Sequence, residues 1–89
     1  MAEVKEYNGL WQNNKMHGKG IFIWPDGRKY EGEYVDDKKE GYGVFYWTDG
    51  RKFDGLWKNG KQNGIGTYHK GGKIRKGNWV DGKRTKWLE

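Results

Sequence analysis

The chain repeats itself with a period of 23 residues, and this periodicity limits the possible folds more than any other feature of the sequence. Aligned on an aromatic residue followed by x-Gly, the copies begin at Tyr7, Tyr30 and Phe53, and the third copy is one residue shorter. A partial copy begins at Arg75 and lacks the later glycine pair. Such a period indicates a stack of similar supersecondary units. We predict an N-terminal extension or edge strand at 1–6, full repeats at 7–29, 30–52 and 53–74, and a partial capping repeat at 75–89.

Each copy contains the turn signals of β-hairpins. Asn59-Gly60 is the strongest sequence signal for a two-residue hairpin turn, because both of its positions need a positive φ. Between copies, Pro25-Asp26-Gly27 and Thr48-Asp49-Gly50 suit three-residue turns, and Gly71-Gly72 suits a two-residue turn. These turns predict an all-β fold, a single-layer, curved antiparallel β-meander of about eight strands built from tandem β-hairpin repeats of 23 residues.

The second strand of each full copy carries two glycines at alternate positions, although glycine weakens a strand. Counting from the turns places Tyr30 opposite Gly43 and Phe53 opposite Gly66. An aromatic ring can lie flat over a glycine, which has no Cβ to obstruct it. We therefore expect these rings to pack on these glycines, and we expect the face that carries them to be concave.

Twelve rings fall on this face, because side chains alternate between the two faces along a strand. The predicted partner groove consists of Tyr7, Trp11, Phe22, Trp24, Tyr30, Tyr34, Phe45, Trp47, Phe53, Trp57, Tyr68 and Trp79. A groove of this kind suits a helical segment of a partner protein. The alternative, that the rings are only the hydrophobic core of a one-layer protein, stays open.

The repeat has a recognisable pattern of aromatic residues and glycines. Residues 7–11 read Tyr-x-Gly-x-Trp, a Gly-x-Gly pair begins seven residues after the tryptophan, and an Asp-Gly turn follows. This pattern resembles the MORN (membrane occupation and recognition nexus) repeat. Tyr34 replaces the tryptophan in the second copy, and Phe53 replaces the first tyrosine in the third. The resemblance implies a binding scaffold for other proteins, for acidic phospholipids, or for both.

The last third of the chain is strongly basic. Residues 58–89 hold nine basic and two acidic side chains, a net charge of +7, whereas residues 1–57 hold nine basic and ten acidic side chains, a net charge of −1. The predicted anionic-ligand patch, on the aromatic face, consists of Lys70, Lys73, Arg75, Arg84 and Lys86. Such a patch suits the phosphate groups of a membrane or of a nucleic acid. The alternative is that the lysines only keep an exposed sheet edge unpaired and soluble.

The sequence does not indicate catalysis, a metal or a cofactor. It contains no serine and no cysteine, which removes the usual nucleophiles of acyl transfer. His17 and His69 each stand alone in their predicted hairpins, and the acidic stretch from Glu31 to Glu40 does not have the spacing of a calcium loop. The Gly-x-Gly pairs precede no predicted helix, which argues against a phosphate-binding loop. We therefore predict no enzymatic activity, no metal site and no cofactor.

The leading functional hypothesis is a non-enzymatic scaffold for protein–protein interaction through the aromatic face. The alternative is peripheral binding to acidic phospholipids, either phosphoinositide or phosphatidylserine, and a single-stranded nucleic-acid platform comes third. The first strand has no capping unit before it, which predicts self-association at the sheet edge. No apolar run approaches the roughly 18 residues of a membrane span. We expect a cytoplasmic protein, with peripheral attachment to a membrane or to a cytoskeletal assembly as a further expectation.

Overall fold

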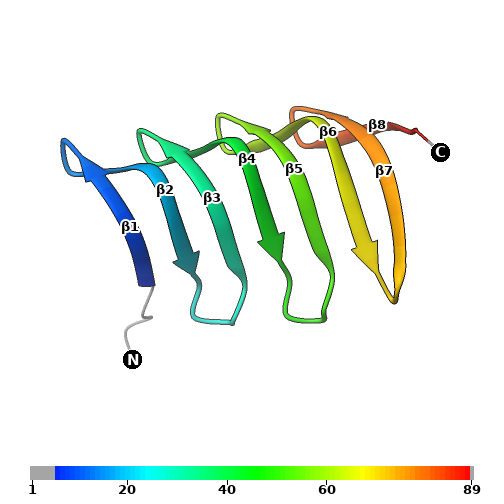
Figure 1. The fold of residues 1–89 in the computed structure, drawn as a ribbon, viewed down its shortest axis with the longest axis horizontal. Helices are drawn as coiled ribbons and strands as arrows, with labels where there is room; N and C mark the ends of the chain where they lie inside the picture. Colours follow the sequence, from blue (N-terminus) through cyan, green and yellow to red (C-terminus); the bar gives the residue numbers. More distant parts are fainter. Residues whose placement is uncertain (1–5, 89) are drawn as a thin grey trace.

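The chain folds into one open antiparallel sheet (Figure 1). The computed structural model describes residues 6–88, so the first five residues of the predicted N-terminal extension, and Glu89, lie outside it. The strands are β1 (Glu6–Gln12), β2 (Lys15–Ile23), β3 (Lys29–Val35), β4 (Lys38–Tyr46), β5 (Lys52–Lys58), β6 (Lys61–Lys70), β7 (Lys73–Val80) and β8 (Lys83–Trp87). They pair in sequence order, and no helix occurs within the described range. The predicted all-β meander of eight strands is confirmed.

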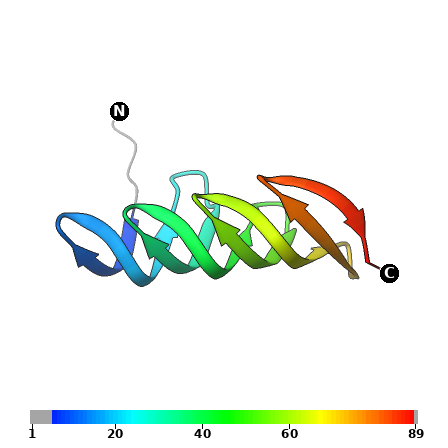
Figure 2. The ribbon, with the colours of Figure 1, turned by 90° about the horizontal axis from the view of Figure 1, so that it is seen from above.

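Successive hairpins follow one another along the long axis of the molecule, as the view from above shows (Figure 2). The molecule measures 40 × 27 × 18 Å along its principal axes. Residues 6–88 offer no helix of the length and apolar character that a membrane crossing needs. Because the described residues form a single open sheet, no second layer covers either of its faces. Each face must be stabilised by the side chains of the sheet itself.

The predicted turn chemistry is present in the backbone. Asn59 and Gly60 have φ values of 52° and 83°, as a two-residue turn between β5 and β6 requires. In the three-residue turn between β2 and β3, the Gly27 N–H donates to the Trp24 carbonyl at 3.0 Å, and Gly27 has a φ of 99°. The Trp24 N–H in turn donates to the Arg28 carbonyl at 2.9 Å, which closes the turn. Turn residues of both kinds therefore adopt the conformations that their sequence predicts.

The predicted register inside each repeat hairpin is wrong beyond the first residue pairs. In the β5–β6 hairpin, Trp57 pairs with Gln62 as counted from the turn, but Gly55 pairs with Gly66 and Phe53 with Tyr68. Three residues of β6, numbers 63–65, therefore oppose the single residue Leu56. The register shifts at the corresponding place in the β1–β2 and β3–β4 hairpins, where Tyr30 pairs with Phe45. Because the shift amounts to two residues, the side chains beyond it in these three hairpins keep their predicted faces.

The expected packing of rings on glycines is confirmed, although the contact is diagonal rather than directly across the strands. A Cβ added to Gly43 would overlap the ring and hydroxyl group of Tyr30, and one added to Gly66 would overlap the ring of Phe53. The Tyr30 hydroxyl reaches past Gly32 along its own strand and donates to the Glu33 carbonyl at 3.2 Å. Each ring therefore lies flat on the sheet over glycine backbone.

The core of the protein lies on this aromatic face. Its buried side chains are Tyr30, Tyr34, Phe45, Phe53, Trp57 and Trp79. Tyr30 and Phe53 have no exposed surface at all. Trp57 packs edge-on against both of them, with ring centroids 5.4 Å and 5.5 Å away. Because the sheet has only one layer, neighbouring side chains of the same face must provide this cover.

Backbone hydrogen bonds join three of the two-residue turns to the hairpin before each of them. The Asp37 N–H donates to the Met16 carbonyl at 3.0 Å, the Gly60 N–H to the Lys39 carbonyl at 2.9 Å, and the Gly82 N–H to the Gln62 carbonyl at 2.8 Å. Each acceptor lies 21, 21 or 20 residues before its donor, so the bond recurs with the repeat. These bonds hold successive hairpins in one orientation and so make the surface periodic.

The free edge at β1 should open before the middle of the sheet. Six of the seven residues of β1 are exposed, and its outer side pairs with no strand of the described chain. In a demonstrated monomer we expect the β1 amides to exchange their hydrogens well before those of β4, because edge strands open at low local free energy. A rise in β1 protection with protein concentration would indicate edge-to-edge pairing. Equal protection of β1 and β4 in the monomer would contradict this prediction.

Candidate binding site

The structure divides the predicted partner groove into buried and accessible rings. The six core rings are each no more than 8% exposed, and of these Trp79 also lines a cleft. Tyr7, Phe22, Trp24, Trp47 and Tyr68 are half-buried, and Trp11 is 60% exposed. The half-buried rings from Phe22 to Tyr68 form a continuous row, in which Trp24 and Trp47 both contact Phe45. On the aromatic face, contact with a partner in this conformation therefore falls mainly on that row and on the ends of the sheet.

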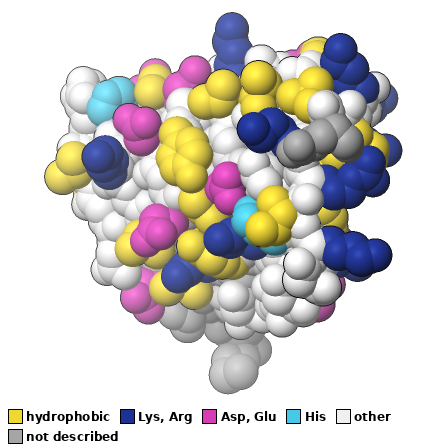
Figure 3. Space-filling view, turned by 45° about the vertical axis from the view of Figure 1, so that its right-hand side comes forward, with side chains coloured by type: hydrophobic (Ala, Val, Ile, Leu, Met, Phe, Trp, Pro, Cys, Tyr) yellow, Lys and Arg dark blue, Asp and Glu magenta, His cyan; other side chains and the backbone are white. Residues whose placement is uncertain are grey.

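Four of the five residues of the predicted anionic-ligand patch lie together on the aromatic face. Lys70, Lys73, Arg75 and Arg84 are exposed, at the end of the sheet formed by β6, β7 and β8. None of them takes part in the three ion pairs found within residues 6–88. Figure 3, which brings the C-terminal end of the sheet forward, shows Lys and Arg side chains gathered along one side of the view. We call these four residues the basic patch.

The fifth predicted residue, Lys86, lies on the opposite face. Trp79 pairs with Arg84, but Asn78 pairs with Lys86 and Gly77 with Trp87, so β8 contains one extra residue, Thr85. A shift of a single residue reverses the faces of everything that follows it. It turns Lys86 away from the basic patch and brings Trp87, which the sequence analysis left out, onto the aromatic face. The prediction for Lys86 is wrong for this reason.

The ring of Trp87 lies between two arginines of the basic patch. The guanidinium carbons of Arg75 and Arg84 lie 4.0 Å and 4.2 Å from its ring centroid. Its ring also packs edge-on against Trp79, with centroids 6.1 Å apart. Stacking on an aromatic ring restricts the two arginines while leaving their N–H groups free to bind an anion.

Two adjoining clefts open on this end of the aromatic face. One, of about 280 Å³, is lined by Trp47, Gln62, Tyr68, Trp79, Arg84 and Trp87. The other, of about 210 Å³, is lined by Tyr68, Lys70, Lys73, Arg75 and Trp87. They share Tyr68 and Trp87, so an aromatic cleft passes directly into a basic one.

Lys39 is a site residue that the sequence analysis missed. It pairs with Tyr34 across the β3–β4 hairpin and therefore lies on the aromatic face. Its side chain is half-buried among aromatic rings, and this burial, together with the nearby charge of Arg28, lowers the pKa of its ammonium group. Lys39 lies one 23-residue repeat after Met16, which packs against the core. This spacing is the sequence signal that predicts its place on the aromatic face.

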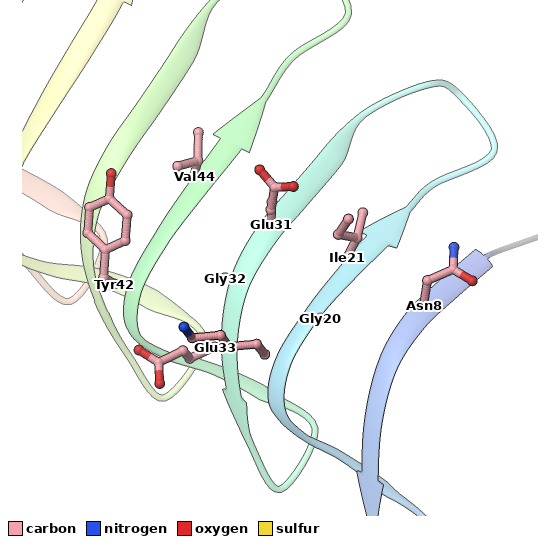
Figure 4. Close-up of a pocket in the computed structure, with 9 residues that line it drawn as sticks. Asn8, Gly20, Ile21, Glu31, Gly32, Glu33, Tyr42 and Val44 are labelled. Carbon is pink, nitrogen blue, oxygen red and sulfur yellow. The ribbon is translucent and has the colours of Figure 1, made fainter.

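A further cleft lies on the other face of the sheet. It has a volume of about 560 Å³ and is lined by Asn8, Lys19, Gly20, Ile21, Glu31, Gly32, Glu33, Tyr42 and Val44 (Figure 4). The side chains come from β1 to β4 and combine apolar surface with the carboxylates of Glu31 and Glu33. A mixed polar and apolar strand face gives no distinctive sequence pattern, so the sequence does not predict this site.

The two histidines differ in their surroundings. His69 does not stand alone, since its Nε2 lies 2.8 Å from Oδ2 of Asp54 on the neighbouring strand. His17 is half-buried, and its Nδ1 has no hydrogen-bond partner. No cluster of three or more potential metal ligands occurs in the described part of the chain. The prediction of an isolated His69 is wrong, because the antiparallel register brings Asp54 beside it.

Burial changes the chemistry of the tyrosines in the core. The pKa values of Tyr30 and Tyr34 are raised well above the usual value, mainly because burial disfavours the charged phenolate. Their hydroxyl groups therefore remain protonated at neutral pH, and in Tyr30 the proton is donated to a backbone carbonyl. These rings stabilise the fold and offer no ionised group to a ligand.

The fold defines a class of protein, an open single-sheet repeat of β-hairpins with clefts on the surface of the sheet. The family model of the MORN repeat matches residues 7–27, 30–50, 53–72 and 76–85. The chain therefore belongs to the MORN repeat family. This repeat is a non-catalytic module that generally serves in binding and scaffolding, often in association with membranes. A comparison with curated proteins finds no significant match.

Proposed function

We propose that the chain is a non-enzymatic binding scaffold that attaches to acidic phospholipid surfaces through its basic patch. The observation that supports this most directly is the exposure of four cations on one face at one end of the sheet. This part of the chain also carries the strong positive charge, since residues 58–89 have a net charge of +7. The proposed location is the cytoplasmic surface of a membrane, where anionic headgroups are concentrated.

The basic patch has enough charge for measurable attachment. A basic residue close to an anionic bilayer contributes about 1 kcal/mol, so four of them would give about 4 kcal/mol before any apolar contact. Trp87 adds an aromatic ring with a polar N–H, a combination suited to the interface between headgroups and acyl chains. Salt weakens such attraction, because the Debye length falls from about 10 Å at 0.1 M to about 3 Å at 1 M.

Neutralising two patch residues tests this proposal. We expect Lys73→Gln combined with Arg75→Gln to weaken binding to vesicles containing phosphatidylserine or a phosphoinositide about 30-fold at low salt, since about 2 kcal/mol of attraction is removed. Vesicle sedimentation at several lipid concentrations would measure the change. The matched control is Lys15→Gln combined with Lys38→Gln, which removes two exposed lysines of the β1–β4 end and should change binding little.

The outcome distinguishes lipid from other anionic ligands. Equal binding by the patch variant and the control, or no binding of the wild-type protein even at low salt, would refute the lipid proposal. If single-stranded DNA binds at concentrations at which vesicles do not, the basic patch serves a nucleic acid instead, with bases stacked on exposed rings. In either case circular dichroism of the variants would show whether the fold is intact.

A protein partner is the second candidate, supported by the continuous row of half-buried rings from Phe22 to Tyr68. Apolar burial depends little on salt, so binding to this row would persist at salt concentrations that release an acidic membrane. An amphipathic helix of a partner could cover the row with one apolar stripe. Trp24 and Trp47 are the residues whose loss would weaken such binding most, because aromatic anchors usually dominate interfaces.

A further inference from the structure

Lys39 places its ammonium group among four rings of the aromatic face. Its Nζ lies 5.3 Å from the ring centroids of Trp24 and Tyr30, 5.6 Å from that of Trp57 and 5.9 Å from that of Phe45. Rings at these distances attract a cation through their quadrupoles, as in proteins that recognise ammonium ligands. We call these four rings the second cage, because the lysine that they surround belongs to the second repeat. The chain thus supplies its own cation to this cage.

One repeat further along the chain, the rings of the cage recur but the lysine does not. The repeat relates the four rings of the second cage to Trp47, Phe53, Tyr68 and Trp79, which we call the third cage. Gln62 takes the place of Lys39, and its side chain is shorter and uncharged. Trp47, Tyr68 and Trp79 line the cleft of about 280 Å³, while Phe53 lies buried below and packs edge-on against Trp79.

The third cage is also more open than the second on one side. The ring centroids of Trp47 and Tyr68 are 6.2 Å apart, whereas those of the corresponding rings Trp24 and Phe45 are 5.4 Å apart. An arginine lies over the tryptophan of each cage, Arg28 at 5.3 Å from the ring centroid of Trp24 and Arg51 at 5.1 Å from that of Trp47. The two cages differ at the lysine position, because Lys39 fills the second cage whereas the third borders an open cleft.

The surroundings of the third cage determine what kind of cation it can take. The Arg51 guanidinium donates to the Tyr68 hydroxyl at 3.4 Å, Arg84 lines the same cleft, and the adjoining cleft carries further cations. These are Lys70, Lys73 and Arg75. A simple cation would be repelled by these charges. A ligand that joins a quaternary ammonium to a phosphate avoids this repulsion, because its phosphate can contact the basic patch while its ammonium enters the cage.

We propose that the third cage and the basic patch together bind a phosphocholine group. The trimethylammonium lies among Trp47, Tyr68 and Trp79, and the phosphate lies in the adjoining cleft against Lys73 and Arg75. This goes beyond attachment to acidic surfaces, which needs no ammonium site. Both a phosphatidylcholine bilayer and soluble phosphocholine carry this phosphate and trimethylammonium group.

Titration of the full chain followed by tryptophan fluorescence tests the proposal, because three of the cage and patch rings are indoles. We expect saturable binding of phosphocholine, and binding at least tenfold weaker for choline chloride and for inorganic phosphate. Comparable affinity for choline alone, tighter binding of a trimethyl-lysine peptide, or no saturable signal with phosphocholine would overturn the proposal.

The decisive variant is Gln62→Lys, which should fill the third cage in the way that Lys39 fills the second. We expect it to weaken phosphocholine binding at least tenfold, equivalent to about 1.4 kcal/mol, without weakening attachment to phosphatidylserine vesicles. Unchanged phosphocholine affinity in this variant would overturn the proposal. This comparison separates the cage from the acidic-surface function, because only the former depends on position 62.

A second variant keeps the test valid should Gln62→Lys fold poorly. The exposed pair Lys73→Gln and Arg75→Gln should lower phosphocholine affinity about tenfold without weakening choline binding, because it removes the phosphate contacts and part of the repulsion of a simple cation. Equal phosphocholine affinity would count against the proposed phosphate position. Phosphatidylcholine vesicles identify the source of the ligand. Vesicle binding that soluble phosphocholine displaces indicates a membrane headgroup, whereas binding of soluble phosphocholine alone indicates a free ligand; both support the site.

Discussion

Replacing Trp57 with alanine should lower the free energy of unfolding by about 4 kcal/mol, the loss typical of a buried tryptophan. Its ring is buried and packs edge-on against Tyr30 and Phe53, and its indole N–H donates to the Gly43 carbonyl at 3.1 Å. The substitution would leave a cavity beneath both rings and an unpaired carbonyl. Urea unfolding followed by circular dichroism would measure the loss.

Trp11→Ala is the matched control, since Trp11 belongs to the same predicted groove but is 60% exposed. We expect it to cost less than about 1 kcal/mol. Equal losses for the two variants would contradict the assignment of Trp57 to the core. The comparison also bears on binding studies, because loss of a partner in Trp57→Ala would report unfolding rather than the loss of a contact.

Replacing Gly43 with valine should lower stability by about 3 kcal/mol, and the melting temperature by more than about 10 °C. A Cβ at this position would overlap the ring and hydroxyl group of Tyr30, which cannot move away without losing its bond to the Glu33 carbonyl. Pairing of Gly43 with Gly55 and Gly32 on either side also brings the strand backbones into this crowded region. Thermal unfolding would measure the effect.

Val44→Ile serves as the control for Gly43→Val, because Val44 is the next residue along β4 and points to the other face. It should change the melting temperature by no more than about 3 °C. A Tyr30→Leu substitution added to Gly43→Val should recover part of the loss, because it removes the ring that the valine overlaps. No recovery, or a melting temperature of Gly43→Val close to that of the wild type, would contradict the packing of rings on glycine.

The register shows how far local sequence reasoning extends. Asn59-Gly60 correctly predicts the turn and the pairing of Trp57 with Gln62. It does not predict that three residues then oppose Leu56, because a bulge depends on how the hairpin packs on its neighbours and not on the turn. The faces remain correct because the shift is even. In β8 the shift is one residue, and there Lys86 and Trp87 exchange faces.

The candidate site was only partly predictable for a related reason. The basic charge and four of the patch residues could be read from composition and alternation along the strands. The cages could not, because each combines rings from three successive repeats with a residue at the start of a hairpin strand. Lys39 has no distinctive sequence neighbours, and only its distances to Trp24, Tyr30, Phe45 and Trp57 reveal its role.

By itself the sequence determined the repeat, the turns, the order of the strands and, up to β8, the face on which each side chain lies. These properties depend on the period of the chain and on residues close to one another within it. Only the tertiary structure decided which rings of that face are buried, since burial in a one-layer sheet depends on the neighbouring hairpins that cover each ring. The same packing decided that one aromatic cage is filled by Lys39 while the next borders an open cleft.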